Sequence, residues 1–208
     1  MSKYLDPKSD IVFKKIFAQH PHLLLSFLNA VLPLPEDGKI AFLEYLSSEQ
    51  IPDIPILKRT IVDVKCKDSQ GRIFIVEMQI EWSKHFMQRL LFGTAQAYVK
   101  QLEKGERYDL LNPVYGLALI NDTFDASEEW YHHYGMVKIK NPQEAIINGL
   151  TLVFVELPKF RPSFSADKRL QVLWLRFMRE LKEGVWAVDP ELLAHAEIRE
   201  AVELSKES

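Results

Sequence analysis

The stretch IVDVKCKDSQGRIFIVEMQIEW, residues 61–82, decides how we interpret the fold. Within 61–67 and 73–82 every even-numbered position is apolar, whereas the odd-numbered positions are mixed. The apolar positions are Val62, Val64, Cys66, Phe74, Val76, Met78, Ile80 and Trp82. Alternation with a period of two is typical of strands with one buried face, and Asp, Ser and Gly favour turns. The sequence therefore predicts a β-hairpin with strands at 61–67 and 73–82.

The register of this hairpin brings two carboxylates together. A hairpin centred on Gln70 places Asp63 opposite Glu77, and directly opposed residues have Cβ atoms about 4.5–5.5 Å apart. We expect both to lie on the non-core face with Lys65 and Lys67. Two carboxylates so placed repel each other, and a divalent cation between them would remove the conflict. The alternative is an ordinary solvated hairpin face on which acids and lysines alternate.

Oxygen ligands near this pair fit a hard cation. Mg²⁺ usually binds one or two carboxylates, and it can polarise a phosphodiester and activate water. Gln79 lies two residues beyond Glu77 on the same face, and the main-chain carbonyl of Met78 is a further candidate ligand. Asp10, at the start of the first predicted helix, is a candidate third carboxylate. It is equally well explained as an N-cap or first-turn residue favoured by the helix dipole.

The remaining elements follow from periodicity, proline and glycine. We predict helices at 11–28 (interrupted near Pro21), 86–102 and 166–181, a charged helical tail from Asp189, a loop at 50–57, and strands at 40–46, 114–120, 135–139 and 150–157. The strand at 114–120 is apolar almost throughout, as expected of a buried central strand. This order favours an α/β (α+β) protein with a mixed central β-sheet flanked by helices.

Composition limits the class of protein. The 208 residues are 47% hydrophobic and 26% charged, which suits one globular domain with appendages. A net charge of −3 excludes a uniformly basic DNA-coating protein and leaves room for a local basic groove. Cys66 stands alone and is expected in the core, and no apolar run approaches about 18 residues. With no signal-peptide pattern at the N-terminus, we expect a cytoplasmic protein that contacts no membrane.

Several motifs together resemble a known family. Asp63, thirteen intervening residues and Glu77-Met78-Gln79 resemble the signature of the PD-(D/E)XK nuclease superfamily. The opening segments DIVFKKIF (10–17) and LSFLNA (25–30), the run at 89–98, and QLEKGERYDLLNPV (101–114) are similar to the Rpn family of recombination-promoting nucleases and transposase-like proteins within it. The resemblance covers roughly residues 5–160.

The resemblance implies a restriction-endonuclease-like core with the order α-β-β-β-α-β, extra strands and C-terminal helices. It divides the chain into a nuclease-like domain at 1–160 and a helical C-terminal extension at 161–208. It also implies a divalent-metal-dependent DNA endonuclease, using Mg²⁺ or Mn²⁺ in its place, linked to DNA recombination or mobile-element movement.

Residue roles are carried over from the same resemblance. Asp63 and Glu77 would bind the metal with the Met78 carbonyl, and Asp10 matches the acidic residue of the family's first helix. Gln79 occupies the position that usually holds a lysine, and we count it with Asp10, Asp63 and Glu77 as catalytic. A glutamine can orient a water or a phosphate oxygen, but it cannot supply the positive charge of a lysine.

DNA and a second copy of the chain are the expected partners. By the resemblance, Gln96 and Tyr98 lie on the helix behind the site and contact DNA. Lys14 and Arg89 belong to a set of cations that could follow phosphates, although a solvated helix surface is the simpler reading, and a core position is the simpler reading for Tyr98. A double-strand break by one active site per chain favours a homodimer.

Other classes of function are weighed against the nuclease. The main alternative is a non-catalytic DNA-binding or regulatory module that retains the nuclease fold. No Gly-rich phosphate loop is present, so no nucleotide cofactor is expected. The histidines at 20, 22, 132 and 133 lack a zinc-site spacing and are expected on the surface or in loops.

Overall fold

The computed structural model describes residues 3–50, 60–61, 63–143, 146–162, 169–185 and 187–206. The helices are α1 (Asp10–Phe17), α2 (Pro21–Val31), α3 (Phe86–Val99), α4 (Arg169–Glu180), α5 (Pro190–Ala194) and α6 (Ala196–Leu204), with short 3₁₀ helices η1 (Glu36–Gly38) and η2 (Tyr108–Leu110). The strands are β1 (Leu43–Tyr45), β2 (Glu49–Gln50), β3 (Thr60–Ile61), β4 (Val64–Asp68), β5 (Ile73–Gln79), β6 (Val114–Ile120), β7 (Tyr131–Val137) and β8 (Ile146–Glu156).

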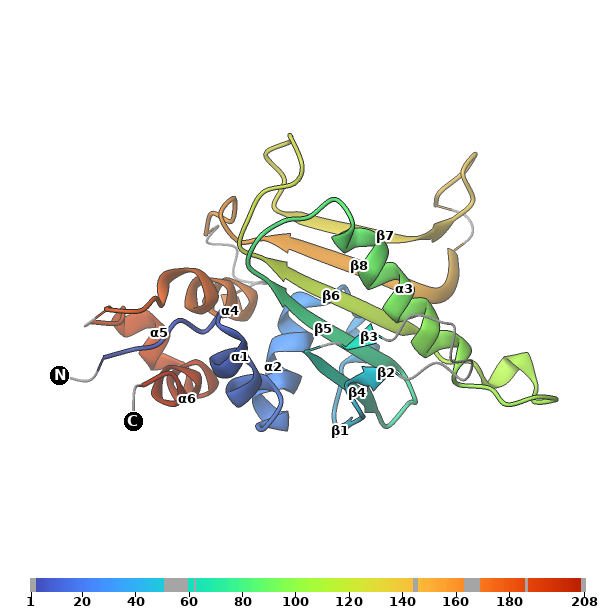
Figure 1. The fold of residues 1–208 in the computed structure, drawn as a ribbon, viewed down its shortest axis with the longest axis horizontal. Coiled ribbons are helices and arrows are strands. Elements are labelled where there is room, and N and C mark those ends of the chain that lie inside the picture. Colours follow the sequence, from blue (N-terminus) through green and yellow to red (C-terminus); the bar gives the residue numbers. More distant parts are fainter. Residues whose placement is uncertain are drawn as a thin grey trace.

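Six strands form one mixed sheet in the order β1-β4-β5-β6-β8-β7 (Figure 1). The strands β5, β6 and β8 run parallel, and β1, β4 and β7 pair antiparallel to their neighbours. The main-sheet elements therefore follow the predicted order α-β-β-β-α-β, with α3 as the crossover between β5 and β6. The mixed α/β architecture predicted from the sequence is confirmed.

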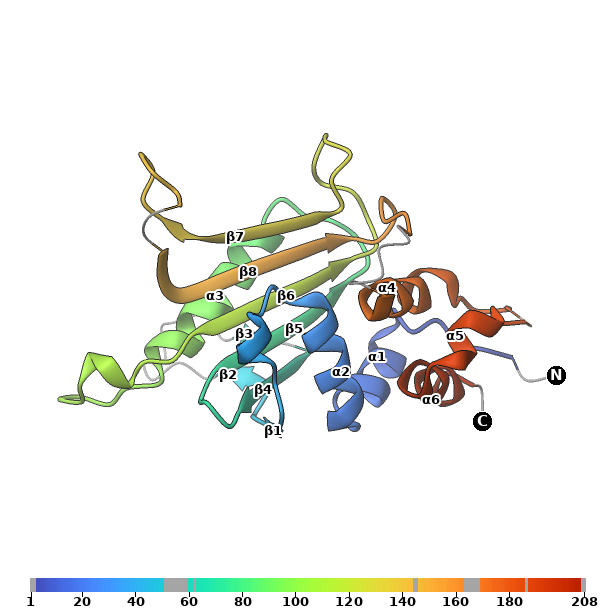
Figure 2. The same ribbon diagram turned by 180° about the vertical axis from the view of Figure 1, so that it is seen from behind.

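Helices cover both faces of the sheet. Helix α3 lies across one face in Figure 1, and α2 lies across the other face when the molecule is turned round in Figure 2. On the α3 face, Phe86 and Leu90 pack against the odd-numbered residues Ile73 and Ile75 of β5. On the other face, α1, α2, α4 and α6 share a larger core with the even-numbered residues of β4 and β5.

The two-sided burial corrects one expectation. We expected the odd-numbered face of the hairpin to lie outside the core, but Ile73 and Ile75 are buried and Glu77 is only 4% exposed. A crossover between parallel strands must place its helix on one face of the sheet. The apolar pattern of β5 alone did not reveal that α3 covers this face.

The hairpin register itself is confirmed. Val64 pairs with Val76 and Cys66 with Phe74, so the hairpin is centred on Gln70. The Asp68 carboxylate accepts the main-chain N–H groups of Gln70 and Arg72, and Gly71 has a φ of 79°. Asp and Gly therefore build this turn as their side-chain chemistry suggests. The Cys66 thiol is buried, as expected, which raises its pKa to about 12.

Some boundaries differ from the prediction. The interruption predicted near Pro21 is confirmed, because α1 ends at Phe17 and α2 begins at Pro21, and β6 matches its predicted range. The strands β4 and β5 are shorter than predicted, and β7 begins earlier, at Tyr131. His132 and His133 therefore lie in a strand; His133 is exposed, as expected, whereas His132 is buried. Most of the predicted loop, 51–57, lies outside the described residues.

The C-terminal helices pack on the N-terminal ones. Trp174 of α4 is fully buried, with its ring centroid 5.7 Å from that of Phe17, and its Nε1 donates to Ser26 Oγ at 3.1 Å. Near the two ends of the chain, Tyr4 forms a β-bridge with Lys206. These helices gather beyond one end of the sheet, on the left in Figure 1. Among the described residues, no helix has the length and apolar character needed to cross a membrane.

Candidate active site

The candidate site lies at one edge of the sheet. The parallel strands β5, β6 and β8 end at the same edge, which is where ligands bind in many open α/β sheets. Because β4 runs antiparallel to β5, the residue that precedes β4, Asp63, also lies there. Glu77 and Gln79 are among the last three residues of β5. The fold thus places all three predicted residues at this edge.

The Asp63 carboxylate is fixed by the neighbouring strand. Its Oδ2 accepts the main-chain N–H of Met78 at 2.7 Å. In an extended strand the N–H and C=O of one residue project to the same side. The Met78 carbonyl is therefore expected on the Asp63 side of β5, which suits the ligand role predicted for it.

Glu77 is buried and only partly neutralised. Its Oε2 accepts from Arg89 Nη2 at 2.9 Å, and Arg89 comes from the first half of α3. The other oxygen, Oε1, is buried and has no hydrogen-bond partner among the described residues. A buried carboxylate oxygen without a partner is energetically unfavourable unless a cation or a water completes it.

Arg89 also contacts Gln79. The same Nη2 donates to Gln79 Oε1 at 3.0 Å, while Gln79 Nε2 donates to the main-chain carbonyl of Glu81 at 2.6 Å. The amide of Gln79 is therefore held from both ends. The Arg89 guanidinium is half exposed and lies over the Phe86 ring, with Cζ 4.7 Å from the ring centroid.

Helix α1 brings a second charged pair. Asp10, the first residue of α1, accepts from Lys14 at 2.7 Å, and Lys14 Nζ lies 3.9 Å from Asp63 Oδ1. Ser9 is the N-cap residue, without a side-chain capping bond, so Asp10 acts as a first-turn carboxylate. Lys14 connects Asp10 to the Asp63 carboxylate electrostatically.

Electrostatics favour a cation at the two carboxylates. Burial raises the pKa of Glu77, Arg89 opposes this, and the charge of Asp63 raises it again. Burial likewise raises the pKa of Asp63, against the Met78 N–H and Lys14, which lower it. The ionised forms of both groups are therefore disfavoured by burial, and a bound cation would stabilise them.

Two predicted DNA contacts lie elsewhere. Tyr98 is in the last turns of α3, and its ring packs against Gly149 of β8, near the opposite edge of the sheet. Gln96 precedes it by two residues, and its Oε1 is buried without a described partner. The structure brings Lys14 and Arg89 to the carboxylates, but not Gln96 and Tyr98.

The residues fit a metal with few protein ligands. Among the described residues, no group of three His, Cys, Asp or Glu side chains could hold a metal ion. Mg²⁺ commonly takes one or two carboxylates and completes its shell with water and substrate phosphate. Asp63, the unpartnered oxygen of Glu77 and the Met78 carbonyl form an oxygen donor set of that kind.

A comparison with protein families decides the relationship. The family model described as PD-(D/E)XK nuclease family transposase matches residues 7–207. The chain belongs to this family. The mixed sheet and its helices are consistent with a restriction-endonuclease-like fold, and Asp63 and Glu77 lie where β4 and β5 meet. No curated protein and no solved structure matches this chain.

Sequence reasoning missed two features of this PD-(D/E)XK protein. Arg89 was expected to meet phosphates or solvent, and its spacing from Glu77 gave no sign of an ion pair. Glu156, at the end of β8, is fully buried and contacts His132 at 2.7 Å and Lys159 at 3.0 Å. The sequence feature that could have indicated Glu156 is a single acidic residue directly after the apolar run of its strand.

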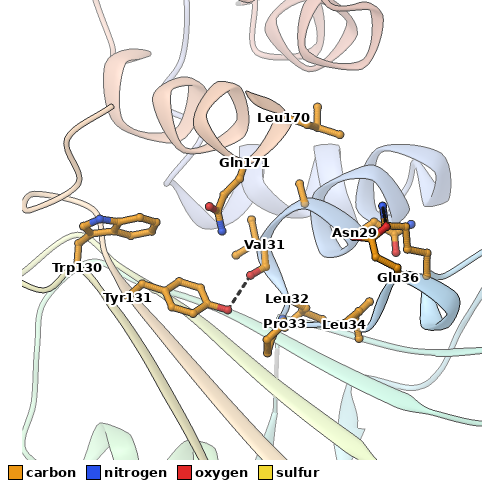
Figure 3. Close-up of a pocket in the computed structure, with 12 residues that line it drawn as sticks. Asn29, Val31, Leu32, Pro33, Leu34, Glu36, Trp130, Tyr131, Leu170 and Gln171 are labelled. Atoms are coloured by element: carbon orange, nitrogen blue, oxygen red, sulfur yellow. Dashed lines mark hydrogen bonds and ion pairs between the residues drawn. The ribbon is translucent and has the colours of Figure 1, made fainter. Parts of the chain in front are cut away.

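A separate pocket lies away from the carboxylates. Its volume is about 510 Å³, and it is bounded by the end of α2, the start of β7 and the start of α4 (Figure 3). Two of its lining residues are joined by a hydrogen bond, in which Tyr131 Oη donates to the Val31 carbonyl at 2.9 Å (Figure 3). It contains none of the predicted site residues, so it does not enlarge the candidate active site.

Proposed function

We propose that this protein is a divalent-metal-dependent DNA endonuclease that hydrolyses phosphodiester bonds. The observation that carries the proposal is the buried Oε1 of Glu77, which has no described partner and lies at the same strand edge as Asp63. Membership of the nuclease family supports DNA as the substrate and a divalent cation as the cofactor. Mg²⁺ is our choice of ion, with Mn²⁺ as a substitute, because all the donors are oxygen atoms.

Each residue has a distinct role in this proposal. Asp63, Glu77 and the Met78 carbonyl hold the ion, and Asp10 acts through Lys14 to set the charge around Asp63. When bound, the ion supplies Lewis-acid polarisation of the phosphodiester and activation of water. Gln79, held by Arg89 and the Glu81 carbonyl, orients a water or a phosphate oxygen.

Arg89 can provide the positive charge that Gln79 lacks at the position where the signature usually has a lysine. Its guanidinium contacts both Glu77 and Gln79, so a positive charge would lie beside a phosphate bound there. A guanidinium can stabilise negative charge that develops on phosphate oxygens. We propose that α3 supplies the charge that a lysine of the signature would supply from β5.

A non-catalytic DNA-binding or regulatory module is the second candidate. The observation that favours it is the Arg89–Glu77 ion pair, which neutralises part of Glu77 without any metal. In this reading the pair is structural and the Asp63 carboxylate serves only to accept the Met78 N–H.

The biological role and the location also belong to the proposal. A role in recombination or mobile-element movement rests on family membership, and a cytoplasmic location rests on the single cysteine.

Plasmid cleavage tests the proposal. Supercoiled DNA is incubated with Mg²⁺ or Mn²⁺ and the wild-type protein, or with Asp63→Ala, Glu77→Ala, Arg89→Ala or the control Glu103→Ala. Glu103 is an exposed acid in the loop after α3. We expect metal-dependent nicking that EDTA abolishes, a loss of about 100-fold or more in the first two variants and a smaller loss in Arg89→Ala.

Two outcomes would reject the nuclease. One is a well-folded wild-type protein that binds DNA but does not cleave it with either metal, which favours the module. The other is cleavage that survives both Asp63→Ala and Glu77→Ala, which would point to a contaminating enzyme or to another site. Normal cleavage by Glu103→Ala is needed to show that removing an acidic residue elsewhere does not abolish cleavage.

A further inference from the structure

A basic pocket lies beside the candidate active site. Its volume is about 640 Å³, and the described residues that line it are Asn121, Pro158, Arg161, Arg179, Glu180 and Lys182. Asn121 directly follows β6, Pro158 follows β8 by two residues, and Arg179 and Glu180 end α4. The residues that line it therefore come from the edge where the parallel strands end and from the end of α4, two elements that lie near each other in Figure 1.

The main chain joins this pocket to the active-site residues. The N–H of Asn121 donates to the Gln79 carbonyl at 2.9 Å. Two strand spacings separate β5 from β8, which is roughly 10 Å. Phosphates along one strand of DNA rise by about 3.4 Å each, so about three nucleotides would reach from Glu77 and Gln79 to the pocket.

The charges in the pocket are not balanced. Arg161 Nη1 donates to the Phe160 carbonyl at 3.0 Å, and Arg179 Nη1 donates to the same oxygen. Two guanidinium groups are thus held around one carbonyl, where their charges repel each other. The structure also stacks Arg179 near the Phe160 ring, with Cζ 5.9 Å from its centroid, so the arrangement is held in place.

The nearby carboxylate does not neutralise this pair. Both oxygens of Glu180 accept from Arg176, at 2.9 and 3.1 Å, whereas Arg179 Nη2 stays 3.9 Å away. Lys182 is exposed, and within the described part of the chain no carboxylate pairs with Lys182 or with Arg161. Three cations therefore face one carboxylate that is already occupied.

We propose that this pocket binds a backbone phosphate of the DNA strand, about three nucleotides from the bond that is cut. Planar guanidinium groups bind phosphate oxygens in pairs, and an anion between Arg161 and Arg179 would remove their mutual repulsion. The location at the strand edge of the active site favours DNA over a free phosphate ion. This inference rests on the proposed nuclease function and names the residues that position its substrate.

DNA binding without cleavage tests the pocket. A fluorescent duplex is titrated with the full chain in EDTA at several salt concentrations, for wild type, Arg161→Ala/Lys182→Ala and the control Lys104→Ala/Lys140→Ala. Both doubles remove two positive charges. Lys104 follows α3, Lys140 lies between β7 and β8, and both are exposed. The end of α3 and the connection between β7 and β8 lie at the opposite end of the sheet (Figure 1).

We expect the pocket variant to lose affinity and to flatten the salt dependence. Each phosphate contact contributes about one to the slope of log K against log salt, so the loss of this single contact should lower the slope by about one in Arg161→Ala/Lys182→Ala. The control double should keep a slope close to that of wild type. A parallel titration with inorganic phosphate, followed by thermal shift, separates a strand phosphate from a small anion.

Four results would overturn the inference. The first two are an unchanged salt slope in the pocket variant and an equal fall of the slope in both double variants. The third is a wild-type protein that binds no duplex at low salt. The fourth is a stabilisation by inorganic phosphate that the pocket variant loses while its salt slope for DNA is unchanged. The binding assay contains no metal, so its result is independent of catalysis. An active wild-type nuclease with an unchanged slope would reject the pocket alone, and a normal slope change without cleavage would reject the nuclease alone.

Discussion

At the scale of single residues, the site is defined by a carboxylate that is buried before any ligand arrives. Glu77 is 4% exposed, one of its oxygens contacts Arg89, and the other has no described partner. Burial disfavours the ionised form of this carboxylate, and a bound cation would stabilise the ionised form again. The energetic consequence is a link between proton binding, metal binding and folding stability.

The first prediction concerns this link at Glu77. Because burial raises its pKa, the folded protein takes up a proton at a pH at which the unfolded chain is still ionised. In EDTA, wild-type stability should therefore increase relative to Glu77→Gln as the pH falls through the folded pKa. Urea unfolding of both proteins between pH 7.5 and 4.5 measures this difference.

Metal addition provides the control for the same variant. Millimolar Mg²⁺ should stabilise wild type at pH 7.5, and stabilise Glu77→Gln less, because an ion that binds only the folded state raises its stability. A stability difference that does not change with pH would contradict the pKa argument. Equal stabilisation of both proteins by Mg²⁺ would remove Glu77 from the metal site.

At the scale of elements, the position of Arg89 depends on how α3 lies on β6. Gly116 of β6 makes this close approach possible: a Cβ there would be 2.7 Å from Thr94 Oγ1 and 3.3 Å from Leu90 Cγ. Leu90 neighbours Arg89 in α3. A side chain at position 116 would therefore push the helix and move the guanidinium away from Glu77 and Gln79.

The second prediction follows from this contact. Gly116→Ala should lower the free energy of unfolding by about 1–3 kcal/mol, since it overpacks a filled core. It should also reduce nuclease activity more than the stability loss explains. Gly135→Ala is the matched control, because a Cβ at position 135 meets nothing within 4 Å and should change stability by no more than about 0.5 kcal/mol. If the two substitutions change the free energy of unfolding equally, α3 can shift to accommodate a side chain at position 116 and the prediction is wrong.

Elements also show how far the sequence could lead. The hairpin centre and β6 were predictable because alternation, turn residues and a continuous apolar run are local signals. That register also predicted that Asp63 lies near Glu77, whereas its hydrogen bond with the Met78 N–H was not predicted. The Arg89 contacts could not be predicted, because they depend on the crossover of α3 between β5 and β6. The buried Glu156–His132 pair likewise joins strands that are neighbours only in the folded sheet.

At the scale of the whole molecule, the C-terminal helices are tied to the nuclease core. Trp174 of α4 contacts Phe17 and Ser26, and α6 shares the same hydrophobic cluster as α1. Helix α1 carries Asp10 and Lys14, so α4 and α6 help to position the charges next to Asp63. The division of the chain at 160/161 stays a prediction.

The third prediction concerns assembly. A nuclease with one active site per chain cuts one strand at a time, so under the proposed function we expect two copies to act together on a duplex. Sedimentation velocity of the full chain, alone and with a duplex that carries a single cleavable site, should show a dimer. A species of one chain under both conditions, together with linearisation of plasmid, would contradict this expectation.

The bridge between Tyr4 and Lys206 makes the chain almost a closed ring, because Leu5 N–H also donates to the Ser205 carbonyl at 2.7 Å. Both ends lie at the helical end of the molecule (Figure 1). A short peptide linker could therefore join them, and new ends could be opened in the exposed β7–β8 turn near Lys140, far from the carboxylates. Such a circularly permuted chain would keep every strand pairing of the sheet while moving any fused tag away from the edge that carries the two carboxylates.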